Sequence, residues 1–169
     1  MMQTLICLTP GQLELVERPK PEAGPGQVLV RVRRIGICGT DYHIYEGNQP
    51  FLSYPRVMGH ELAVEVVANR TGRGPGVGKI CVVNPYLSCG ACVACRRGKP
   101  NCCTHLQVLG VHRDGGMTEY LALPPDNLIV ADDLNPDECA MVEFLAIGAH
   151  AVRRGSVASI DRALIVGAG

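Results

Sequence analysis

The sequence predicts a mostly β protein with some α structure, built as a partly open β-barrel or a compact α+β domain. Six or seven short segments with strand character are separated by turns rich in glycine and proline, and one convincing helical stretch follows them. Four closely spaced cysteines interrupt this series of strands, which predicts a metal-binding lobe beside the barrel.

Length and composition narrow the class of protein. A chain of 169 residues suffices for one domain with its own core and leaves little for a complete second one. Sixteen basic and sixteen acidic residues balance, and aromatic residues make up only 4%, so we expect no nucleic acid and no membrane as partner. A small neutral or singly charged ligand fits better.

The first half of the chain carries clear strand patterns. Thr4–Leu8 and Leu13–Glu17 alternate between apolar and polar residues across a Pro-Gly turn, which predicts a hairpin. Gln27–Ile37 has a period of two and predicts a strand that ends next to Cys38. Asp41–Glu46 predicts a short helix, and the β-branched run Leu62–Ala68 predicts a strand buried on both faces.

The second half contains shorter strands and the helix. Ile80–Val83, Met117–Ala122 and Leu128–Val130 are predicted strands. Pro136 opens a stretch rich in Ala, Met, Leu and Glu that predicts a helix to about Arg154.

The cysteine-rich segment is the most specific signal. Cys89, Cys92, Cys95 and Cys103 form the pattern C-x2-C-x2-C-x7-C, in which four thiolates can surround one zinc ion. Because four thiolates fill the coordination shell, this zinc is expected to be structural. Cys102 could replace Cys103, and a pair of disulfides or an iron–sulfur cluster are the alternatives.

The nine cysteines also bear on the cellular compartment. Their number is odd and Met1–Leu8 lacks the features of a secretory signal, so reduced thiols in the cytoplasm are expected. No stretch is long and apolar enough to cross a membrane.

A second metal site is predicted between Gly36 and Glu61. Cys38, His43, His60 and Glu61 bring a thiol, two imidazoles and a carboxylate into one loop-rich segment, a mixture that suits zinc. The alternative is that Cys38 is a buried small apolar residue and His60 a hydrogen-bonded surface residue.

These motifs together resemble the zinc-dependent medium-chain dehydrogenases, the family of alcohol, sorbitol and threonine dehydrogenases. The resemblance rests on Gly36–Asp41, Gly59–Glu61, the four-cysteine lobe and Gly115–Tyr120, which together span most of the chain. It implies that residues 1–150 form a GroES-like barrel with two zincs per chain. Residues 151–169 would be a linker helix and the first strand of a truncated Rossmann NAD(P)-binding domain.

The resemblance also assigns roles to individual residues. Cys38 and His60 would bind the catalytic zinc, with a carboxylate from Glu61 or Glu143 and a water. That zinc would lower the pKa of a substrate hydroxyl, whose proton would pass through Thr40 to His43. From the residues alone, Thr40 and Asp41 can also be read as a helix N-cap.

The activity implied is oxidation of a secondary alcohol in a polyol or sugar acid, with NAD or NADP as cofactor. Gly167 and Gly169 would begin the cofactor site, but the third glycine and the helix after it are absent, so this chain alone is expected to bind NAD(P) negligibly. The full-length protein would be a homodimer or homotetramer. The alternative function is a zinc-binding structural or interaction module, or an inactive remnant, without catalysis.

Overall fold

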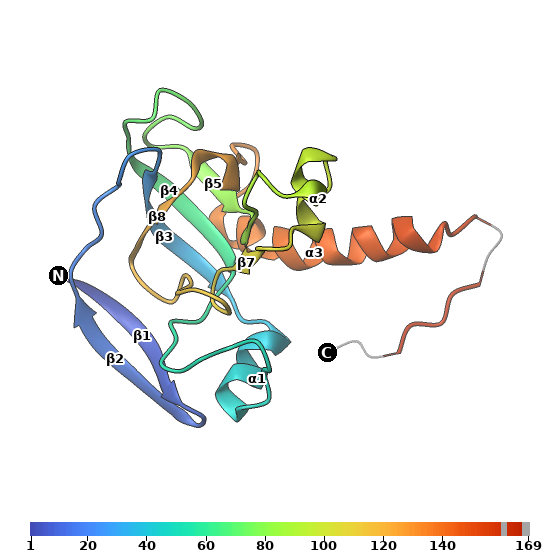
Figure 1. The fold of residues 1–169 in the computed structure, drawn as a ribbon, viewed down its shortest axis with the longest axis horizontal. Helices are drawn as coiled ribbons and strands as arrows, with labels where there is room; N and C mark the ends of the chain where they lie inside the picture. Colours follow the sequence, from blue (N-terminus) through green and yellow to red (C-terminus); the bar gives the residue numbers. More distant parts are fainter. Residues whose placement is uncertain (160–161, 167–169) are drawn as a thin grey trace.

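A computed structural model of the chain describes residues 1–159 and 162–166. The strands are β1 (Met2–Thr9), β2 (Gln12–Arg18), β3 (Val28–Gly36), β4 (Glu61–Asn69), β5 (Ile80–Val83), β6 (Tyr86–Leu87), β7 (Gln107–Val108), β8 (Tyr120–Leu123) and β9 (Leu128–Val130). The helices are α1 (Gly39–Glu46), α2 (Val93–Arg96) and α3 (Pro136–Gly155), with short 3-10 turns at Pro100–Cys102 and Pro125–Asn127. The mostly β class is confirmed (Figure 1).

An antiparallel five-stranded sheet in the order β8-β3-β4-β5-β9 forms the centre of the molecule. The predicted hairpin β1–β2 lies at its side, and Leu5 N donates to Met117 O at 2.8 Å. Thr118 pairs with Thr4 of β1, so the expected strand from Met117 begins only at Tyr120, where pairing with β3 takes over. The hairpin therefore closes part of the barrel, and the two edge strands leave the rest open.

Strand β4 is buried on both faces in its first half, as predicted. Leu62, Val64 and Val66 point into the central apolar core, whereas Ala63 points to the opposite face and packs with Cys139 and Ala140 of α3. The β-branched run therefore packs against apolar residues on both faces of the sheet, because side chains alternate along a strand. The central core also contains Val28, Val30, Cys81, Val83, Leu109, Leu123 and Leu128.

Helix α3 begins at a complete capping box, in which Asn135 Oδ1 accepts from the amides of Asp137 and Glu138. It ends at Gly155, one residue beyond the predicted end. Its buried residues, Cys139, Ala140 and Glu143, lie in its first half, and Figure 1 shows the rest of the helix extending past the sheet.

Residues 151–155, expected as a linker helix, are the last turn of α3. Residues 162–166 form neither helix nor strand, so the strand expected there is not seen in the part of the chain that the structure describes. A strand requires a hydrogen-bonded neighbour, and Leu164, Ile165 and Val166 are almost fully exposed. Gly167 and Gly169 lie outside the described residues. Within the described residues, no helix has the length and apolar character needed to cross a membrane.

Candidate metal centres

The structure brings together two groups of side chains that could hold a metal ion, and both were predicted. In each group the potential ligand atoms lie within 4.8 Å of one another. The first group is Cys89, Cys92, Cys95 and Cys103, and the second is Cys38, His60 and Glu61.

The four-cysteine group has the dimensions of a site for one ion. The Sγ atoms of Cys89 and Cys103 are 3.4 Å apart, those of Cys92 and Cys95 are 3.5 Å apart, and those of Cys89 and Cys95 are 4.0 Å apart. Tetrahedral zinc with bonds of about 2.3 Å to sulfur requires sulfurs about 3.8 Å apart. The spacing fits a single tetrahedral ion.

Cys103, not Cys102, completes this group. Cys102 is exposed, and its Sγ accepts from Asn101 Nδ2 at 3.5 Å. All nine cysteines are free thiols, so the alternative of a disulfide pair is not supported. Two single strands, β6 before Cys89 and β7 after Cys103, connect the lobe to the barrel.

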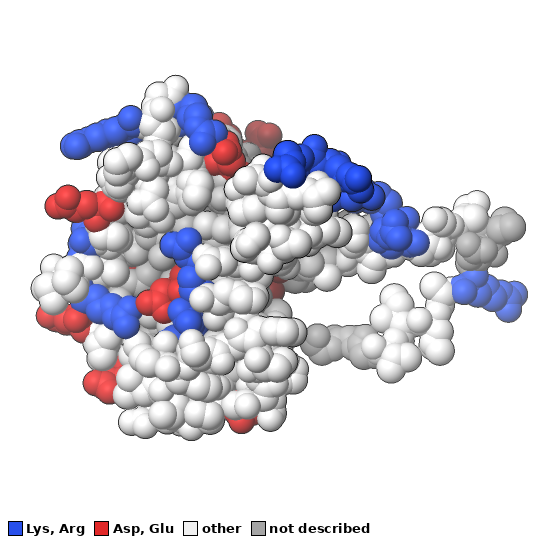
Figure 2. Space-filling model, viewed as in Figure 1, with Lys and Arg blue, Asp and Glu red and all other residues white. Residues whose placement is uncertain are grey.

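The electrostatics of the lobe suit a cation. Backbone amides, first that of Cys95, lower the pKa of the Cys92 thiol to about 5. Desolvation and then the hydrogen bond with Cys92 raise the pKa of Cys95 to about 11, and a bound cation would favour the Cys95 thiolate. Arg96, Arg97 and Lys99 follow the cysteines, and Figure 2 shows basic side chains gathered over α2. These cations offset part of the charge of four thiolates.

The second group forms where strands β3 and β4 pair, next to the start of α1. Gly36 pairs with Glu61, and Cys38 follows two residues later as the N-cap of α1. A Cβ atom at Gly36 would lie 2.2 Å from Glu61 Oε2, so only glycine allows this approach. Gly59 has a φ of +91°, a left-handed conformation that glycine adopts freely, and it turns the chain into His60.

Asp41 connects the two segments that carry these residues. Its Oδ2 accepts from the amide of Cys38 at 3.0 Å, and its Oδ1 accepts from the amide of Gly59 at 3.2 Å. The alternative reading of Thr40 or Asp41 as the N-cap is wrong, because Cys38 takes the N-cap position and Asp41 is the third residue of its capping box. A buried carboxylate that accepts two backbone bonds fixes the spacing of Cys38 and His60.

His60 and Glu61 are both buried, so their polar side-chain atoms need partners inside the protein. His60 Nδ1 is buried and has no hydrogen-bond partner among the described residues. Burial is the main cause that raises the pKa of Glu61, with the neighbouring charge of His60 opposing the shift and Glu143 and Asp41 adding to it. A bound cation would satisfy the ring nitrogen and favour the ionised carboxylate, so these residues fit a metal ion.

Glu143 is buried on α3 and lies near enough to Glu61 for its charge to raise the pKa of that carboxyl. Tyr86 Oη donates to Glu143 Oε1 at 3.1 Å, and burial, then Glu143, raise the pKa of Tyr86 to about 12. Sequence reasoning missed Tyr86, because the contact joins residues 57 positions apart and no local pattern signals it.

The two residues of the predicted proton relay lie on α1. Thr40 is partly buried in the first turn, beside Cys38. The His43 ring is exposed, with its Nδ1 4.0 Å from Glu46 Oε2. Positions three apart share one face of a helix, so both side chains lie on the same side of α1.

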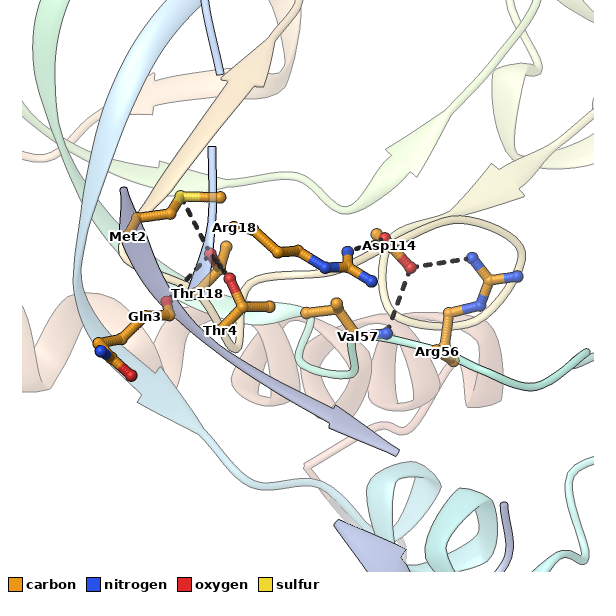
Figure 3. A network of polar contacts seen from close by, with 8 residues as sticks. All are labelled: Met2, Gln3, Thr4, Arg18, Arg56, Val57, Asp114 and Thr118. Atoms are coloured by element: carbon orange, nitrogen blue, oxygen red, sulfur yellow. Dashed lines mark hydrogen bonds and ion pairs between the residues drawn. The ribbon is translucent and has the colours of Figure 1, made fainter. Parts of the chain in front are cut away.

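A polar network around Asp114 holds the segment before His60 in place (Figure 3). Asp114 Oδ1 accepts from Arg56 Nη1 and from the amide of Val57, both at 3.2 Å, and Asp114 Oδ2 accepts from Arg18 Nη1 at 2.9 Å. The network ties β2 and the loop around Asp114 to the segment that leads to His60. It was not identified from the sequence.

Comparison with known proteins points to one family. Residues 24–133 match the family model of the alcohol dehydrogenase GroES-like domain. The chain is 44% identical over 173 residues to an L-galactonate-5-dehydrogenase of Escherichia coli K12, covering 99% of this chain and 50% of the relative. The chain thus spans about half the length of the curated relatives it matches.

Solved structures agree with this result. A crystal structure of an alcohol dehydrogenase, RspB of E. coli CFT073, complexed with NADH, matches with a TM-score of 0.83 and 39% identity, covering 92% of this chain and 46% of that one. A cobalt- and zinc-bound thermostable alcohol dehydrogenase of Pyrobaculum aerophilum matches with a TM-score of 0.74 and 32% identity, covering 82% and 44%.

Proposed function

Because the chain belongs to the zinc-dependent medium-chain dehydrogenases, whose alcohol dehydrogenase GroES-like domain it contains, we propose that it is the zinc-binding part of an enzyme that oxidises a secondary alcohol of a polyol or sugar acid with NAD or NADP. The observation that supports this most is the meeting of the partly buried Cys38 with the buried His60 and Glu61 in one group, separate from a four-cysteine site.

The two groups take different roles in this proposal. Cys89, Cys92, Cys95 and Cys103 hold a structural zinc, because four thiolates leave no open position. The catalytic zinc is held by Cys38, His60 and a carboxylate. Glu61 supplies that carboxylate as a member of the group, or Glu143 supplies it from α3.

Bound zinc would supply Lewis acidity, which lowers the pKa of an alcohol hydroxyl. The protein's own residues then have to position that hydroxyl and remove its proton. The Thr40 hydroxyl, beside Cys38, would accept this proton while giving its own to the ring of His43 on the same face of α1, and His43 would release a proton to water.

The remaining parts of the proposal concern the longer protein. Residues 151–169 would lead into a Rossmann domain, where Gly167 and Gly169 contribute to the NAD(P) site. The longer protein would be a homodimer or homotetramer acting on a small-molecule alcohol. Nine free thiols suit a reducing, cytoplasmic setting.

Metal content per chain tests the proposal. The purified chain should contain two zinc ions, Cys38→Ser and Cys103→Ser should each retain one, and Cys102→Ser, the matched control, should retain both. A wild-type chain that binds a single ion, lost in Cys103→Ser, would contradict the enzyme and favour a zinc-binding module without catalysis.

A further inference from the structure

The geometry points to Tyr86 as a positioning residue for the second metal group, holding the Glu143 carboxylate in the neighbourhood of Glu61. This inference rests on the proposed function, since it concerns the site that would hold the catalytic zinc. Its starting point is the hydrogen bond of 3.1 Å from Tyr86 Oη to Glu143 Oε1.

Glu143 needs such a partner because of where it lies. It is buried on the same part of α3 as Cys139 and Ala140, which pack in an apolar layer with Ala63 of the sheet. A buried carboxylate is costly unless it is hydrogen-bonded or paired with a cation. Tyr86 provides a neutral donor, which orients one carboxylate oxygen and leaves the negative charge of Glu143 available to a cation.

The backbone of Tyr86 is itself held by hydrogen bonds, which fix the position from which its side chain extends. Its amide donates to Asn84 Oδ1 at 3.1 Å, and its carbonyl accepts from Nδ2 of the buried Asn127 at 3.1 Å. Asn127 Nδ2 also donates to Asn84 O at 2.7 Å. Strand pairing of Tyr86 with Val108 adds a further constraint from β7.

The same strand connects the two metal groups. Tyr86 opens β6, which leads into Cys89, and its partner strand β7 follows Cys103. The four-cysteine lobe follows Leu87 and precedes Gln107, so it closes one end of this ribbon. Tyr86 therefore links the lobe physically to Glu143. A metal ion in the four-cysteine site is expected to restrict the motion of the Glu143 carboxylate.

Cobalt binding to the chain provides the test, because cobalt bound to thiolate absorbs in the visible range and reports ligand geometry. Tyr86→Phe removes only the hydroxyl. We expect it to weaken cobalt binding at the Cys38–His60 site by about tenfold and to shift the spectrum of that site, as loss of an outer partner does, while the four-cysteine site keeps its affinity. Tyr45→Phe, which removes a hydroxyl from the exposed side of α1, is the matched control.

A double-mutant cycle separates positioning from general structure. In a Glu143→Ala background, Tyr86→Phe should have no further effect on cobalt affinity, since its partner is gone. An unchanged second site in Tyr86→Phe, equal weakening of both sites, or full additivity with Glu143→Ala would each overturn the inference. A wild-type chain that binds only one ion would instead contradict the proposed function on which the inference depends.

Discussion

At the scale of single residues, the candidate catalytic site depends on contacts around its ligands as much as on the ligands themselves. Asp41 spans the Cys38 and Gly59 amides, and Gly36 leaves the space that Glu61 occupies. The ligand types could be read from the sequence. The residues that hold the ligands in place could not be read from the sequence. Asp41 was visible as part of the Gly36–Asp41 motif, but its role was not.

Asp41→Asn tests the role of the bridging carboxylate. Asparagine keeps the shape but replaces one acceptor oxygen by a donor, so one of the two amides loses its partner. We expect metal affinity at the Cys38–His60 site to fall about 10- to 100-fold, and the metal-free chain to lose about 1–3 kcal/mol of unfolding free energy. Chelator competition and urea unfolding measure the two effects. The exposed Asp133→Asn should change neither, and a normal affinity in Asp41→Asn would refute the bridge.

The raised pKa of Glu61 predicts that the unfolding free energy of the metal-free chain depends on pH. Its pKa is raised on folding, chiefly by burial, so the native state holds a proton at a pH where the unfolded chain has lost it. The stability contributed by Glu61 is therefore complete below its unfolded pKa of about 4.3 and is lost as the pH rises through its native value.

Glu61→Gln should remove this dependence. In EDTA, the unfolding free energy of wild type relative to Glu61→Gln should decrease from pH 4 to pH 7, as measured by urea denaturation. The exposed Glu14→Gln serves as control. A difference that grows with pH would mean that Glu61 is stabilised as an anion, contrary to its burial.

At the scale of elements, the sequence located the long strands and the helix well, because period-two patterns and capping residues are local signals. β5 and β9 have the predicted bounds, and α3 begins at the predicted Pro136. The two-residue strands β6 and β7 escaped prediction, since two residues carry no periodicity. Met117 and Thr118 were assigned to a strand of the sheet but pair with the hairpin, a choice made by tertiary contacts.

Asn135→Ala tests the local signal that starts α3. It removes the side-chain oxygen that accepts from the amides of Asp137 and Glu138, at 2.9 and 3.0 Å. A loss of about 1 kcal/mol in unfolding free energy is expected, and Asn135→Asp should restore most of it because aspartate caps equally well. Thermal or urea unfolding measures both. A loss in Asn135→Asp as large as in Asn135→Ala would show that capping is not the cause.

At the scale of the whole molecule, helix α3 leaves an apolar stripe uncovered on the side away from its buried residues. Met141, Phe144, Leu145 and Val152 are each 44% exposed or more and follow one another at helical spacing. Contiguous apolar surface of this kind promotes association in water.

We expect the isolated chain to associate as its concentration rises, with an increasing average mass in sedimentation. Replacing Leu145 and Val152 by lysine should reduce this association while leaving the metal content unchanged, because neither residue lies in a metal group. Val77→Lys, which alters an equally exposed valine in a distant loop, is the control. Equal association of the wild-type chain, the lysine variant of Leu145 and Val152, and Val77→Lys would show that a different surface mediates the association.

The sequence by itself determined the mostly β class, the chain order of the strands, and the residue types and spacing of both metal groups, since these are carried by local periodicity and short motifs. The tertiary structure confirmed Cys103, favoured by its spacing, over Cys102, and it alone decided that Asp41 reaches Gly59 and that Tyr86 meets Glu143. The reason is physical: these contacts join residues 18 to 57 positions apart in the chain, or choose between adjacent side chains, and only packing brings such groups together.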